Sequence, residues 1–193
     1  MELLRKSNRT NEETKTLESA LYRINLSNMD LRDCDFSGLR ICRPQFQGSQ
    51  MTGCKFVRTS LIMANFTDAK LNGADFTNAY LENVNFHNAS AIHLIFHRVI
   101  IRGGIFTNTD VSFTRFDRTV FFRSYTECVD FKDAITVGVS MSRIKDPKGS
   151  IKNLTLVNQS YLRNIRDRAH LNMIAKHIYL PPDVEREISL YMI

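Results

Sequence analysis

Apolar residues recur at every fifth position over most of the chain, from Leu21 to Phe131. Within this series only Thr126 is polar, and no insertion breaks the phase. An α-helix repeats at about 3.6 residues and a β-strand at about 2, so a period of five belongs to neither element. The pattern therefore predicts a repeat architecture in place of separate helices and strands.

A second position in each group of five is also restricted. Two residues before most of the apolar places there is a small side chain, as at Ala64, Ala69 and Ala74. One small and one large residue of every five then point inward, and the other three face water. Stacked coils of short extended segments satisfy this pattern, because each coil hydrogen-bonds to the next about 4.8 Å away.

Phenylalanine alternates with aliphatic residues along the apolar places. If four groups of five make one square turn, the phenylalanines stack in two ladders on opposite walls, and the aliphatic side chains line the other two walls. The predicted core ladder comprises Phe36, Phe46, Phe56, Phe66, Phe76, Phe86, Phe96, Phe106 and Phe116.

Three consecutive groups are Ala64-Asn65-Phe66-Thr67-Asp68, Ala69-Lys70-Leu71-Asn72-Gly73 and Ala74-Asp75-Phe76-Thr77-Asn78. They resemble the pentapeptide-repeat family, whose pattern is a small residue, Asp or Asn, Leu or Phe, and two unrestricted residues. The similarity covers at least residues 19–133. It implies a mainly β fold, a right-handed quadrilateral β-helix with four pentads per coil and about six to seven 20-residue coils.

Three regions are expected along the chain: residues 1–20 with a short helical cap, the repeat β-helix over 21–158, and a helical C-terminal cap or dimerisation segment over 159–193. Thr10 and Glu13 fit a capping box that starts a helix over 11–20. Ser160 is expected to cap a helix that runs to Ile178, and a further short helix is expected over 183–191. The apolar stripe of the first C-terminal helix consists of Tyr161, Ile165, Ala169 and Met173.

The composition restricts the function. The chain has 26 basic and 20 acidic residues, a net charge of +6. The repeat body carries 17 basic and 12 acidic residues, spread thinly, so it forms neither a nucleic-acid-binding arm nor the acidic surface of a DNA mimic. No apolar run is long enough to span a membrane, and no signal-peptide pattern starts the chain. The expected location is the bacterial cytoplasm, or a host cell reached by secretion without a cleaved signal peptide.

No nucleophile elbow, phosphate-binding loop or zinc-protease motif is present. His170 and His177, with Asp167, share one face of the expected C-terminal helix, whereas the remaining histidines, His87, His93 and His97, fall on different walls. The four cysteines (Cys34, Cys42, Cys54 and Cys128) lack metal-site spacing and are expected to be reduced thiols, although Cys34 and Cys54 lie one coil apart. We therefore predict no catalytic residue, no metal, no cofactor and no enzymatic activity.

The outward residues single out one wall, centred on Ile41, Leu61, Leu81, Ile101 and Phe121. It is richer in apolar side chains than the other three and carries four arginines against one glutamate, which is typical of an interface. The predicted partner-binding residues are Ile62, Met63, Tyr80, Ile100, Arg102, Val120, Phe122 and Arg123. Two interpretations stay open: the wall binds another protein, or the chain covers it with its own C-terminal segment or with a second copy.

A weaker feature is the basic column formed by Arg58, Arg98 and Arg118, spaced one or two coils apart and interrupted by Asn78. Such a column binds phosphate or an acidic partner, or is simply a solvated face. We do not expect nucleic-acid binding.

The resemblance implies two classes of function. One comprises DNA mimics that bind type II topoisomerases such as DNA gyrase and protect them from drugs or toxins. The other comprises repeat domains of bacterial secreted effectors and similar adaptors. The positive charge argues against the first class, although Asp30, Asp33 and Asp35, or Asp110, Asp117, Asp130 and Asp133, supply local acidic patches. We predict a non-catalytic protein-binding scaffold whose partner is an unidentified protein, with the gyrase-binding mimic as the alternative. A homodimer, formed through the C-terminal helices or the apolar wall, is a further possibility.

Overall fold

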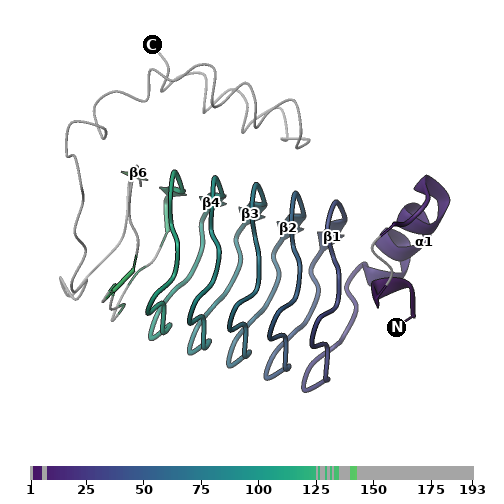
Figure 1. The fold of residues 1–193 in the computed structure, drawn as a ribbon, viewed down its shortest axis with the longest axis horizontal. Helices are drawn as coiled ribbons and strands as arrows, with labels where there is room; N and C mark the ends of the chain where they lie inside the picture. The colour runs from purple at the N-terminus through teal and green to yellow at the C-terminus, as the bar shows by residue number, and fades with distance from the viewer. Residues whose placement is uncertain are drawn as a thin grey trace, which may run out of the picture.

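The computed structural model describes residues 2–5, 8–124, 126, 129, 131, 133–134 and 140–142. A short 3-10 helix, η1 (Glu2–Arg5), precedes the helix α1 (Asn11–Leu21). Six three-residue strands follow: β1 (Arg40–Cys42), β2 (Ser60–Ile62), β3 (Tyr80–Glu82), β4 (Ile100–Arg102), β5 (Val120–Phe122) and β6 (Ser140–Ser142). Figure 1 shows the strands aligned along a row of stacked coils, with α1 at the N-terminal end.

The six strands form one parallel sheet in sequence order. Each pairs with the strand 20 residues further on, so that Ile41 lies opposite Leu61, and Leu61 opposite Leu81. The unbroken five-residue phase of the sequence is the cause, because four pentads return the chain to the same wall.

The other three walls carry isolated parallel bridges in place of strands. Their lines of pairing also repeat every 20 residues, as in Asp35 with Lys55 and Lys55 with Asp75. Backbone hydrogen bonds join successive coils at each bridge; the N–H of Phe56, for example, donates to the carbonyl oxygen of Asp75 at 2.7 Å. Four lines of pairing confirm the mainly β quadrilateral β-helix. Strands β1 to β6 delimit five turns, slightly fewer than expected; residues 143–158 lie outside the described part.

The phenylalanines of the core are buried and stacked. Phe56 and Phe76 have ring centroids 4.5 Å apart and nearly parallel planes, and Phe46 and Phe66 stack at 5.0 Å on the opposite wall. Rings of the two ladders meet edge to face, as Phe56 and Phe66 do at 5.8 Å. These are the two favourable geometries for aromatic pairs, so the alternation along the chain fills the rod without a central channel.

The coils turn at a repeated backbone conformation. The second residue after the apolar place has a positive φ in nearly every pentad, between 51° and 72°. Glycine, asparagine and aspartate tolerate this left-handed region, and they occupy many of the corners. Met63 and Phe113 adopt it as well, with φ of 55° and 57°, although their side chains give no local compensation.

The N-terminal segment closes the first coil. The Thr10 Oγ1 accepts the N–H of Glu13 at 3.2 Å, and the Glu13 carboxylate accepts the N–H of Thr10 at 2.8 Å, so the expected capping box forms. Arg9 is the main tie to the coil, because its guanidinium donates to the carbonyl oxygens of Asp35 at 2.7 Å and Ser37 at 2.9 Å. The expected helices over 160–178 and 183–191 lie outside the described residues.

Candidate protein-binding surface

Strands β1 to β5, together with the corner residue after each of them, form what we call the strand wall. On the other walls, an Asp or Asn before the apolar residue often accepts the backbone N–H two residues further on, as Asp35 does from Ser37 at 2.8 Å. This turn bends the chain. On the strand wall the same place holds Arg40, Ser60, Tyr80, Ile100 and Val120. With no Asp or Asn at that place, and with Tyr, Ile and Val in three coils, an extended strand is favoured there.

The structure brings the predicted partner-binding residues together on this wall and shows that they differ in exposure. Met63 is 43% exposed and Arg123 is exposed, whereas Ile62, Arg102, Val120 and Phe122 are half-buried. Tyr80 and Ile100 differ from the expectation that all eight face water, because they are only 0% and 4% exposed. Residues at the corners and at the end of each strand therefore form the accessible part.

Tyr80, Glu82 and Arg102 form a connected polar group on the wall. The Tyr80 hydroxyl donates to the Glu82 carboxylate at 3.0 Å, and the Arg102 guanidinium donates to the same carboxylate at 3.4 Å. Burial raises the pKa of Tyr80, and the negative charge of Glu82 raises it further, which keeps the phenol neutral and able to donate. The sequence signal for this group is the spacing of 2 within one strand and of 20 between coils.

Arg123 and Phe122 lie at the C-terminal end of the wall. The Arg123 guanidinium carbon is 5.1 Å from the centre of the Phe122 ring, which is within cation–π range. At the N-terminal end, the Glu18 carboxylate of α1 accepts the N–H of Arg40 at 2.6 Å and so satisfies part of the edge of the first strand. A shallow hollow between α1 and the wall is lined by Glu18, Arg40, Ile41, Cys42, Ser60 and Ile62.

The basic column lies on one corner of the rod, as the repeat predicts. Arg58 and Arg118 are exposed, and Arg98 is half-buried. Next to this corner, the Asp117 carboxylate accepts hydrogen bonds from Arg115 at 3.0 Å and lies 2.9 Å from the Nδ1 of His97. This carboxylate lowers the local positive potential, so the corner is a weaker candidate anion site than the column alone suggested.

The acidic patches are paired with bases. Asp30 binds the Arg32 guanidinium at 2.6 Å, and this hydrogen bond lowers the pKa of Asp30 to about 2. Asp35 is buried 3.8 Å from the guanidinium of Arg9. Asp130 and its neighbours from 135 onward to 139 lie outside the described residues. The described carboxylates therefore present little uncompensated negative charge.

The groups that carry chemistry in the sequence do not assemble. Within the described residues, no cluster of His, Cys, Asp and Glu is suited to hold a metal ion. The Cys34 and Cys54 thiols are free and buried, and the Cys54 thiol donates to the Leu31 carbonyl at 3.0 Å. Burial raises the pKa of both thiols, that of Cys54 to about 12, which makes them poor nucleophiles.

Two further observations concern residues at the margins of this survey. Asp167, His170, His177 and Cys128 lie outside the part of the chain that the structure describes. Across the described residues, no helix is both long and apolar enough to cross a membrane.

A parallel β-solenoid with a preformed strand wall and aromatic ladders defines the class of protein. Residues 20–58 and 64–103 match the family model described as Pentapeptide repeats, in eight copies. The chain is a pentapeptide-repeat protein over these residues, which confirms the resemblance found in the sequence. No curated protein matches the chain in sequence.

Solved structures of pentapeptide repeat proteins are similar to parts of the chain. One from the Arabidopsis thaliana thylakoid lumen is 28% identical over 56% of this chain and 69% of its own, with a TM-score of 0.34. HetL of Nostoc, involved in heterocyst differentiation regulation, is 14% identical over 71% and 68%, with a TM-score of 0.28. QnrB1, a plasmid-mediated fluoroquinolone resistance protein, is 14% identical over 83% and 97%, with a TM-score of 0.34. The fold assignment rests on the strand register and the family match.

Proposed function

We propose that this protein is a non-catalytic scaffold that binds a protein partner through the strand wall. The observation that carries this proposal is the composition of the accessible part of the wall, where Ile62, Met63 and Phe122 lie beside the guanidinium groups of Arg102 and Arg123. Apolar and aromatic side chains mixed with arginine are enriched at protein interfaces.

The rod supports binding because its coils are held by hydrogen bonds on four walls and by a continuous aromatic core. A preformed surface loses little conformational entropy when a partner binds. The small, polar and paired side chains on the other walls make them weaker candidates. A role as a bacterial secreted effector or its repeat domain agrees with a binding scaffold, and the location of the protein stays a prediction.

The test compares two double variants. Ile62→Asp with Met63→Asp places charge on the strand wall, and Val57→Asp with Ile92→Asp places the same charge on half-buried apolar residues of other walls. Tagged wild-type protein is used to capture a partner, which is then purified and titrated directly. We expect the wall variant to weaken binding at least tenfold and the control variant to bind normally. Equal binding by both variants would refute the strand wall as the binding surface.

The alternative, a gyrase-binding DNA mimic, has less support. DNA mimicry requires a continuous negative surface, whereas the repeat body is basic and its described acidic patches are paired with Arg9, Arg32, Arg115 and His97. A direct test of this alternative follows from the charge of the whole molecule and is described below.

A further inference from the structure

Three isoleucines in consecutive pentads give an internal comparison of the walls. Ile95, Ile100 and Ile105 occupy the same pentad place on three neighbouring walls, so their backbones present the side chains outward in the same way. Ile95 and Ile105 are half-buried, whereas Ile100 on the strand wall is 4% exposed. The residue type and the local backbone do not explain the difference, so something covers the strand wall.

The cover lies over the middle of the wall. In the coils before Ile100, the equivalent residues Tyr80 and Ser60 are 0% and 6% exposed. At the two ends of the same column, Arg40 is exposed and Val120 is half-buried. The covered column thus runs across β2, β3 and β4, at right angles to the strands.

These side chains are buried within a single chain, so what covers them belongs to the same chain. The described residues before the coils are η1 and α1, and α1 packs against β1 at the N-terminal end of the rod (Figure 1). They do not reach β3 and β4. We propose that the C-terminal segment, with the helix expected over 160–178, lies across β2 to β4 and occupies the strand wall.

The length of the chain allows this return. The 17 residues between Ser142 and Ser160 span up to about 58 Å when extended. The distance from β6 back to β2 is four coil spacings, about 19 Å. A helix of 19 residues is about 28 Å long, enough to cross the three covered strands.

The chemistry of the wall fits an apolar cover. The hydroxyl of Tyr80 is already bonded to Glu82, and Glu82 is bonded to Arg102, so the polar atoms of the column have partners within the wall. Burying such a satisfied group under an apolar surface costs little, whereas an unsatisfied group would be penalised. The stripe Tyr161, Ile165, Ala169 and Met173 supplies a surface of that kind.

The cover has a consequence for binding, which rests on the function proposed above. A partner on the strand wall either uses only the accessible margin at Met63 and Arg123 or displaces the C-terminal segment. The segment is then an intramolecular competitor that sets the apparent affinity for the partner.

The test measures how fast thiols placed on the three walls react. In full-length protein with Cys42→Ser and Cys128→Ser, single Ile95→Cys, Ile100→Cys and Ile105→Cys variants are treated with a disulfide reagent; Cys34 and Cys54 are buried. We expect Ile100→Cys to react at least tenfold more slowly than the other two. Adding Ile165→Asp and Met173→Asp should remove this protection. The matched pair Arg163→Asp and His170→Asp, on the polar side of the helix, should retain it.

Three results would overturn the proposal. Equal rates for the three thiols would mean that no cover exists. Protection that survives Ile165→Asp and Met173→Asp, with an unchanged circular dichroism spectrum, would assign the cover elsewhere, and protection that disappears on dilution would assign it to a second copy. Because no partner is present in these measurements, failure of the proposed binding function would leave the result for the cover intact, and the reverse also holds.

Discussion

Side chains in the small inward column show how single residues match their positions. The hydroxyl of Thr59 donates to the carbonyl of Phe36 at 2.8 Å, and the thiol of Cys54 makes the equivalent bond to Leu31 at 3.0 Å. Each small polar group is buried, and each is paired with the coil below. The column therefore accepts Ser, Thr or Cys as readily as Ala, which explains its mixed composition.

Gly104 occupies the small column where the core is tightest. A Cβ at this position would lie 2.6 Å from Ile101 Cγ2 and 2.9 Å from the Phe106 ring. We expect Gly104→Ala to lower the free energy of unfolding by about 1–3 kcal/mol through overpacking. Urea denaturation measures this. As a control, Gly73→Asn at an open corner with a φ of 69° should change stability little; a larger loss there than at Gly104 would contradict the explanation.

Cys54 predicts a specific dependence on pH. Burial raises the pKa of this thiol from 9.0 to about 12, so the folded protein holds the proton more tightly than the unfolded chain. The resulting stability is complete below pH about 9 and is lost as the pH rises towards 12. Cys54→Ser keeps a donor to Leu31 but does not titrate in this range. The variant should lose less stability than the wild type between pH about 8 and about 10, whereas Cys42→Ser should behave as the wild type.

Among the elements, the aromatic ladders are the part that both stabilises the coils and sets their spacing. The Phe76 ring stacks on Phe56 at 4.5 Å and packs edge to face on Phe66 and Phe86 at 6.2 Å. Each ring contacts coils on both sides, so the coils are coupled to their neighbours, as in other repeat proteins.

Removing one ring from the middle of a ladder should be costly. We expect Phe76→Ala to lower the free energy of unfolding by about 3–5 kcal/mol, because the coils cannot collapse into the cavity without breaking their register. Chemical denaturation followed by circular dichroism gives the value. Phe113→Ala, at an exposed corner, serves as the surface control. A loss below about 1 kcal/mol for Phe76→Ala would show that the ladder does not hold the coils.

The N-terminal cap depends on Arg9, whose side chain is 5% exposed and donates to three backbone carbonyl groups. Arg9→Ala removes these donors, so we expect a loss of about 1–3 kcal/mol and fraying of the first coil. Hydrogen exchange at Phe36 and Gly38 would report the fraying. The exposed pair of Asp30 and Arg32 provides the comparison, since Arg32→Ala should leave stability nearly unchanged.

At the scale of the whole molecule, the distribution of charge separates the two functional classes. The net charge is +6, and the described carboxylates at the N-terminal end and on the Asp117 wall face arginine or histidine. The accessible margin of the strand wall adds further positive charge at Arg123. Such a rod attracts acidic surfaces and repels the cationic saddle that binds DNA in a topoisomerase.

We therefore expect no protection of a type II topoisomerase by this protein. The measurement is a supercoiling assay with a fluoroquinolone, with the protein at high molar excess and QnrB1 as the positive control. Relief of inhibition by this chain would contradict the charge argument and restore the mimic as the preferred function.

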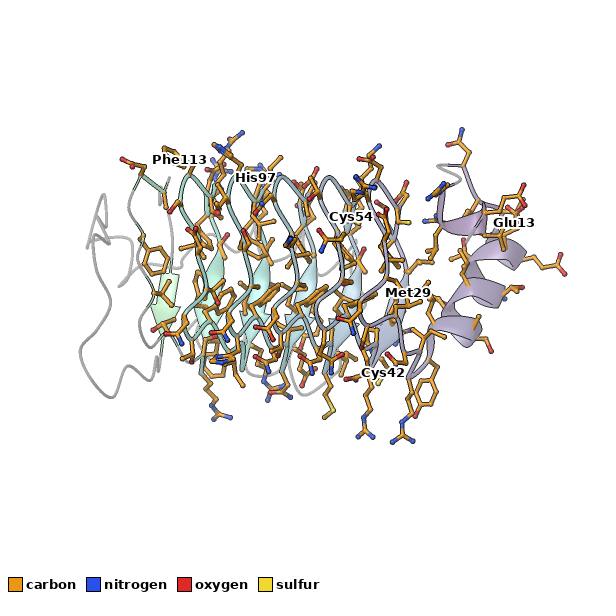
Figure 2. All side chains as sticks on the ribbon, turned by 90° about the horizontal axis from the view of Figure 1, so that it is seen from below. Glu13, Met29, Cys42, Cys54, His97 and Phe113 are labelled. Atoms are coloured by element: carbon orange, nitrogen blue, oxygen red, sulfur yellow. The ribbon has the colours of Figure 1, made fainter. Side chains whose placement is uncertain are left out.

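Figure 2 shows how the rod separates its surfaces, with Phe113 and Cys42 at opposite edges and α1 with Glu13 beyond the first coil. The placement of such residues follows from the phase of the repeat alone. The wall centred on Ile41 and Leu61 was therefore identifiable from the sequence, as were the phenylalanine ladders and the capping box at Thr10. The polar group of Tyr80, Glu82 and Arg102 was missed, although its spacings of 2 and 20 residues were a usable signal.

By itself, the sequence determined the period, the phase and therefore which residues point into the core, because a five-residue repeat without insertions leaves a single register between coils. Only the tertiary structure decided which outward residues meet water. Ile95, Ile100 and Ile105 are identical in type and in pentad place, yet Ile100 alone is buried. Burial of an outward side chain depends on what packs against the wall from elsewhere in the chain, and no local pattern encodes that contact.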